Sequence, residues 1–172
     1  ITDALGKPLT YTVNKTMMRI DLPAPLKPGQ KYIFKVDWSY KIVDRMEYGG
    51  SRGGYEYFPE DGNSLFTIAQ WYPRLCVYRE FALTFGNFKV QMTVPADHMV
   101  GSTGECQNYQ QVLTPTQFAR WQKAQNAKDV VEMVTLEEAK AAEKTKSKAK
   151  KTWIFKADNV RDFAWTSSRK FI

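Results

Sequence analysis

The chain has 172 residues, with a hydrophobic fraction of 43% and an aromatic fraction of 14%, which is enough for one domain with a sizeable core. This composition excludes a largely disordered protein, and no apolar run approaches the about eighteen residues of a membrane-spanning helix. The formal net charge is +7, but +5 of it lies within residues 139–151, where six lysines face one glutamate. The remaining surface is ordinary, so the charge by itself does not indicate an anionic partner.

The first ninety or so residues alternate apolar and polar side chains, as half-buried β-strands do. We expect a strand at 18–22, a type II turn centred on Pro28 and Gly29, and a long strand at 31–41. One face of the long strand would be buried and the other exposed to solvent, which is typical of antiparallel sheets. The buried face would carry Tyr32, Phe34, Val36, Trp38 and Tyr40.

Residues 69–78 hold two large aromatic side chains, a proline and an arginine in ten positions. Aromatic residues of this kind either close a core or line a binding surface. The glycine-rich loop at 49–54 leads into a strand-like run rather than into a helix, so it is not expected to bind phosphate.

A hairpin is expected farther along the chain. The alternating runs 80–85 and 88–94 are separated by Gly86 and Asn87, a pair typical of a type II′ turn because glycine supplies the positive φ at its first central position. The second strand should end at Pro95.

Two helices are expected in the last third. Thr114 with Gln117, and Thr135 with Glu138, have the spacing of capping boxes, and a proline follows Thr114. We interpret 114–151 as a helical, lysine-rich insertion whose end, 144–151, is a mobile solvated loop because it has almost nothing apolar to bury. A strand at 153–156 and the aromatic residues of 162–165 then return to the core.

The residues offer little catalytic chemistry. His98 is the one histidine, so no zinc-binding histidine pair and no H-E-x-x-H motif exists, and we expect His98 to serve in a loop or cap. Cys76 and Cys106 could form one disulfide, but their spacing does not require it. We predict no catalytic residue and no metal ligand in this chain, which is expected to be inactive alone.

Five segments in order resemble one family. They are Q-W-Y-P-R at 70–74, E-F-A-L-T-F-G-N-F at 80–88, V-P-A-D-H at 94–98, S-T-G at 102–104 and N-V-R-D-F-A-W at 159–165. Together they resemble the N-terminal β-domain of aminopeptidase N-type (gluzincin) zinc metallopeptidases of a bacterial branch. The resemblance covers nearly the whole chain apart from the lysine-rich insertion.

The resemblance implies a mainly β fold, an antiparallel saddle-like sheet or β-sandwich over residues 1–172, with one or two short helices in the C-terminal third. It implies a catalytic domain of the same protein as partner, in which H-E-x-x-H and a downstream glutamate bind zinc, while this chain binds no cofactor. Residues 162–172 resemble the join to that domain. Peptides would be the substrates, and relatives of this kind in Gram-negative bacteria are often exported to the periplasm or beyond.

Relatives also place a Glu or Gln of this domain against the free amine of the substrate, a few residues before the positions matching Ala69 and Gln70. Counting back leads to Ser64 or Leu65, with Asn63 and Glu60 as the closest polar residues. The candidate substrate-binding residues are therefore Glu60, Asn63 and Ser64, together with Gln70 from the matching segment itself. The chain departs from its relatives between Tyr78 and Glu80, where a longer aromatic and glycine-containing segment is reduced to Arg79.

Two other functions stay open at this point. A stand-alone β-sandwich module could bind a glycan or a protein through an aromatic platform of Trp71, Tyr72 and Tyr55. The lysine run 144–151 could contact nucleic acid, but it lacks the interleaved aromatic residues that such binding uses, so no nucleic-acid partner is expected.

Overall fold

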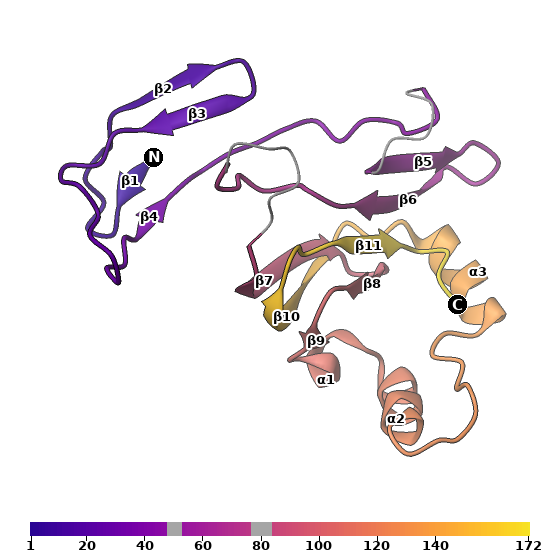
Figure 1. Ribbon diagram of the computed structural model, residues 1–172. Coiled ribbons are helices and arrows are strands. Elements are labelled where there is room, and N and C mark those ends of the chain that lie inside the picture. The colour runs from indigo at the N-terminus through magenta and orange to yellow at the C-terminus, as the bar shows by residue number, and fades with distance from the viewer. Residues whose placement is uncertain (48–52, 77–83) are drawn as a thin grey trace. The chain divides into compact units, whose positions relative to one another are not determined.

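The computed structural model describes residues 1–47, 53–76 and 84–172 (Figure 1). It is mainly β, and every strand pair between named strands is antiparallel. The predicted fold class, an antiparallel, sandwich-like β-domain, is confirmed. The chain divides into two compact units, one formed by Ile1–Lys41 and Tyr72–Ala82, the other by Ile42–Trp71 and Leu83–Ile172. The single domain over 1–172 stays a prediction.

The first unit contains two small sheets. β1 (Thr2–Asp3) pairs with β4 (Phe34–Lys35), and β2 (Tyr11–Asn14) pairs with β3 (Met17–Ile20). The predicted turn is confirmed, because the Gln30 backbone N–H donates to the Lys27 carbonyl at 3.1 Å and Gly29 has φ +78°.

The long strand predicted at 31–41 is wrong. Only Phe34–Lys35 pairs within a sheet, and Trp38 and Tyr40 are about half exposed, at 47% and 52%. Alternation creates a face that could be buried, but a strand also needs a neighbour and a cover, and the described part of this unit supplies only the two residues of β1. Leu9 is the one buried hydrophobic residue among its described positions.

The second unit has two larger sheets. One has the order β7-β10-β9, with β7 (Gly86–Pro95), β9 (Glu105–Cys106) and β10 (Lys150–Val160). The other has the order β5-β6-β11-β8, with β5 (Gly54–Phe58), β6 (Asn63–Ile68), β8 (Met99–Ser102) and β11 (Trp165–Ser168). The core of this unit includes Trp153 and Phe163, both fully buried.

The predicted turn at Gly86 and Asn87 is also wrong. Gly86 belongs to β7, pairs with Val160 and does not have a positive φ. The Asn87 side chain instead accepts a hydrogen bond from the Asn159 backbone at 2.8 Å, beside an irregularity in β10. Of the partner strand expected at 80–85, residues 80–83 lie outside the described residues. The expected end of the second strand at Pro95 is confirmed.

In the described residues three helices lie between β9 and β10: α1 (Tyr109–Val112), α2 (Pro115–Ala124) and α3 (Leu136–Thr145). Both predicted capping boxes are present, on Thr114 and on Thr135. The single turn α1 was not predicted. None of the helices in the described residues is long and apolar enough to cross a membrane.

The lysine run is only partly a loop. Lys146 ends α3 in the left-handed conformation, and β10 begins at Lys150. The Lys151 ammonium lies 5.0 Å from the centre of the Trp153 ring and donates to the Val112 carbonyl at 3.0 Å. The prediction failed at Lys150 and Lys151 because a lysine stem can cover an aromatic core residue while its charge binds a helix C-terminus.

We predict that Gly104→Ala destabilises the second unit more than Gly62→Ala, by about 2 kcal/mol, because both glycines have positive φ but only Gly104 is enclosed by backbone. A Cβ on Gly104 would overlap the Lys156 carbonyl oxygen, whereas on Gly62 it would meet the movable Lys146 ammonium at 2.8 Å. Urea denaturation of the two variants measures the difference. Equal losses would show that backbone conformation, and not crowding, controls both positions.

Candidate functional site

The turn between β5 and β6 gathers three of the four predicted substrate-binding residues. Phe58 pairs with Asn63, so Glu60 lies in the loop between them and Ser64 follows in β6. Gln70 is separated from them by the length of β6, and it is exposed with φ +54°. The structure therefore brings Glu60, Asn63 and Ser64 together and leaves Gln70 apart.

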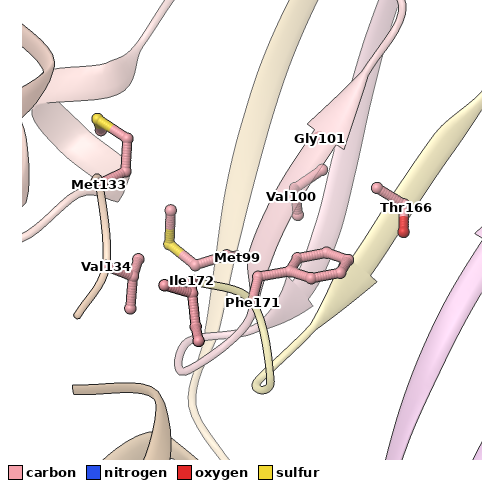
Figure 2. A pocket seen from close by; sticks show the side chains of 8 residues that line it. All are labelled: Met99, Val100, Gly101, Met133, Val134, Thr166, Phe171 and Ile172. Carbon is pink, nitrogen blue, oxygen red and sulfur yellow. The ribbon is translucent and has the colours of Figure 1, made fainter. Parts of the chain in front are cut away.

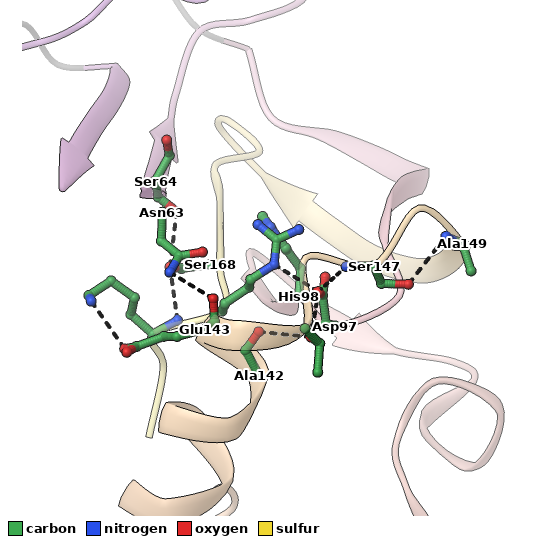
Figure 3. Close-up of polar contacts among 12 residues, drawn as sticks. Asn63, Ser64, Asp97, His98, Ala142, Glu143, Ser147, Ala149 and Ser168 are labelled. Atoms are coloured by element: carbon green, nitrogen blue, oxygen red, sulfur yellow. Dashed lines mark hydrogen bonds and ion pairs between the residues drawn. The ribbon is translucent and has the colours of Figure 1, made fainter. Parts of the chain in front are cut away.

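Asn63 and Ser64 make hydrogen bonds that join this turn to neighbouring elements. Asn63 is 1% exposed, and its side-chain amide donates to the Glu143 carbonyl of α3 at 3.1 Å (Figure 3). The Asn63 side-chain oxygen is buried and finds no hydrogen-bond partner among the described residues. The Ser64 carbonyl accepts from the Ser168 hydroxyl at 3.0 Å. These contacts join β6 to β11 and to the end of α3.

The Lys170 side chain places a primary ammonium group beside this turn. The Lys170 ammonium forms ion pairs with the carboxylates of Asp61 and of Glu143, the latter at 3.1 Å, and lies 4.9 Å from the centre of the Phe58 ring. The hydrogen bond to Asp61 is the main cause of a raised Lys170 pKa, and the same bond lowers the pKa of Asp61. Two carboxylates and an aromatic face are suitable partners for an ammonium ion.

Sequence reasoning missed Asp61, Glu143 and Lys170. Asp61 is adjacent to the predicted Glu60, so the turn itself was a usable signal. Glu143 and Lys170 lie far from it along the chain, and no local pattern marks them as neighbours of the turn.

A second cluster of polar contacts surrounds the Asp97 carboxylate. This carboxylate accepts from the Arg169 side chain at 2.8 Å, from the Ser147 backbone at 2.6 Å and from the Thr145 hydroxyl at 2.9 Å. Burial alone would raise the pKa of this carboxyl, which is 8% exposed, but the three donors lower its pKa to about 2. Asp97 therefore ties the end of α3 to the end of β11.

His98 lies in the turn between β7 and β8, consistent with its predicted loop role. It is 3% exposed, and its Nδ1 lies 2.9 Å from the hydroxyl oxygen of Ser167, which is 1% exposed. Burial, with the nearby Arg169 charge, lowers the pKa of His98 to about 4. The neighbouring Asp97 carboxylate accepts hydrogen bonds from Arg169, Ser147 and Thr145 rather than from His98. Ser167, His98 and Asp97 therefore do not have the hydrogen-bond arrangement of a catalytic triad.

Two of the three aromatic residues of the suggested platform, Trp71 and Tyr55, make contacts within the second unit. The Trp71 indole N–H donates to the Phe163 carbonyl at 2.9 Å, and the Tyr55 ring lies 5.9 Å from that of Phe66. Both cysteines are free, Cys76 exposed and Cys106 buried, and burial raises the pKa of the Cys106 thiol. The segment between Tyr78 and Glu80 lies outside the described residues.

One shallow apolar pocket, of about 270 Å³, lies beside β8 and the start of α3 (Figure 2). It has no charged side chain in its lining and offers no groups for catalysis. The lining residues are Met99, Val100, Gly101, Met133, Val134, Thr166, Phe171 and Ile172. Across the described residues, no group of three or more His, Cys, Asp or Glu side chains could hold a metal ion.

No protein-family model, curated protein or solved structure matches this chain. The family resemblance therefore depends on the five sequence segments, and the site on the geometry given above.

We predict that the second unit loses about 3 kcal/mol of stability as the pH falls from 6.5 to about 4, because unfolded histidine takes up a proton there while buried His98 does not. The contribution of His98 is fully present above pH 6.5. Urea denaturation at a series of pH values measures it. Because the chain has one histidine, His98→Gln should flatten the slope between pH 6.5 and 5. An unchanged slope in that variant would contradict the assignment.

Proposed function

We propose that this chain is the N-terminal, non-catalytic domain of a zinc-dependent aminopeptidase, where it walls one side of the active-site cleft and helps to recognise peptide N-termini. The observation that supports the proposal is the ordered set of five segments that resemble those of the aminopeptidase N-type β-domains. The antiparallel β architecture is compatible with it. Zinc would be held by the catalytic domain, as the family resemblance implies.

The turn between β5 and β6 supports a role in binding an ammonium group. Glu60 is exposed, and its carboxylate makes no hydrogen bond or ion pair with any described residue. The adjacent Asp61 is already paired with Lys170. Glu60 is therefore the acid at this turn that is available to the α-ammonium of a peptide, which a carboxylate stabilises by charge-assisted hydrogen bonding.

The complete protein that contains this chain, loaded with zinc, should release N-terminal residues from short peptides and should spare the same peptides when their N-termini are acetylated. Acetylation removes the positive charge that the proposed site recognises. Chromatographic analysis of the products measures both activities. Failure to release any N-terminal residue from a varied peptide set would overturn the proposal.

In the same protein, Glu60→Gln should raise KM about tenfold with kcat within about twofold, because binding of the ammonium would weaken while the reacting groups stay in place. Glu132→Gln, which changes an exposed acid away from the turn, is the matched control and should leave both constants unchanged. Equal KM values for the Glu60 and Glu132 variants would remove Glu60 from the amine site but would leave the peptidase assignment standing.

The alternative, a stand-alone module that binds a glycan or a protein through Trp71, Tyr72 and Tyr55, receives less support. The Trp71 indole N–H is used by the Phe163 carbonyl, and Tyr55 packs on Phe66. The hypothesis that 144–151 binds nucleic acid also receives less support, because Lys151 contacts the Val112 carbonyl and the Trp153 ring.

A further inference from the structure

Helix α3 is attached differently at its two ends. At the first end, Val134 just before the helix and Ala139 in its second turn are both buried, at 4% and 2% exposure. These positions correspond to N′ and N4 of the capped helix, the two that form a hydrophobic staple. Ala139 is the one fully buried residue within α3, so the most deeply buried apolar packing lies in its N-terminal half.

At the C-terminal end no residue of 140–147 is fully buried, and several polar contacts attach it. The Glu143 carbonyl accepts from Asn63 and the Glu143 carboxylate binds Lys170, while Thr145 and Ser147 donate to Asp97 (Figure 3). Water competes for the same groups, so each of these contacts contributes only about 0.5–3 kcal/mol net. Segments with few buried apolar contacts are the ones that open locally, without unfolding of the whole domain.

The groups beneath this end are those of the candidate site. Asn63 is polar and begins β6 beside the hairpin turn, yet it is almost fully buried, and α3 supplies a carbonyl that its amide contacts. Its side-chain oxygen is a buried acceptor without a donor among the described residues, which is an unfavourable state. A ligand that donates a hydrogen bond would improve that state, and movement of the end of α3 would release the Asn63 side chain from the Glu143 carbonyl for such a ligand.

We propose that α3 is a detachable cover over part of a binding site for a primary ammonium group, formed by Glu60 and Asn63 at the turn between β5 and β6. Pivoting about its apolar N-terminal end releases Glu143 and exposes the Asn63 amide. This inference rests on the proposed function for the identity of the ligand, the α-ammonium of a peptide. The docked helix is then an autoinhibitory contact, in which the Glu143 carbonyl occupies the Asn63 side-chain amide.

Hydrogen exchange of backbone amides in the complete protein tests whether α3 detaches. In Asp97→Asn, and separately in Glu143→Gln, the amides of 140–147 should exchange at least about tenfold faster, with those of β6 and β11 at wild-type rates. Glu137→Gln changes an exposed acid in the first turn of α3 and is the matched control. If α3 and β11 exchange at one common rate in the wild type and in every variant, α3 opens only on global unfolding and the cover is refuted.

Peptidase kinetics test the autoinhibition. Asp97→Asn, which lies outside the ammonium site, should lower KM about threefold with kcat unchanged, because more molecules have an open site. Faster exchange of α3 with an unaltered KM would show a mobile helix that inhibits nothing, and would overturn the inference.

A separate probe keeps the two proposals distinguishable. Glycinamide carries a primary ammonium group and no carboxylate, and its titration into the zinc-free protein should shift the Asn63 side-chain amide signal more strongly in Asp97→Asn than in wild type. If the complete protein lacks peptidase activity but shows this shift, the proposed function fails and the covered ammonium site stands. If no shift occurs in either protein, the site itself is refuted.

Discussion

The pairing of β7 with β10 is the interaction on which the second unit depends. The ladder runs from Pro95 opposite Lys150 to Gly86 opposite Val160, and it joins segments about sixty residues apart in the sequence. Its inner positions bury Trp153 and Phe155 at 0% and 2% exposure. Closing so long a loop is entropically costly, and burial of two large aromatic side chains offsets that cost.

The same ladder determines where the polar groups meet. Beyond its last pair, the Ala96 backbone N–H still donates to the Ala149 carbonyl at 2.9 Å. The next residue, Asp97, is thereby placed beside Ser147 and the end of α3, and Arg169 completes the contact from the end of β11. Strand register thus positions a buried charge next to its three donors, a geometry that makes the burial of a carboxylate tolerable.

Local patterns in the sequence predicted local structure well. The capping boxes at Thr114 and Thr135, the turn at Pro28 and Gly29, and the strand end at Pro95 each depend on a few adjacent residues. The errors arose where tertiary context decided. Alternation at 31–41 did not create a partner strand, Gly86 was used inside a strand, and Lys151 found an aromatic face to cover.

The candidate site shows the same division. Glu60, Asn63 and Ser64 share one turn and could be selected by counting along the chain, whereas Glu143 and Lys170 reach that turn only through the fold. The burial of Asn63 was also beyond sequence reasoning, because the helix that covers it belongs to the segment that had been interpreted as an insertion with a solvated end. Its lysines are indeed mostly exposed, but its backbone carbonyl at Glu143 is not free.

The sparse interior of the first unit affects how the protein melts. With Leu9 as the one buried hydrophobic residue among its described positions, this unit has little apolar area to return to water on heating, whereas the second unit has the aromatic core around Trp153. Heat capacity and unfolding enthalpy scale with such area. Calorimetric unfolding of the chain would therefore be dominated by one large endotherm from the second unit, preceded by a broad, weakly cooperative loss of the first, so a single melting temperature would describe only part of the molecule.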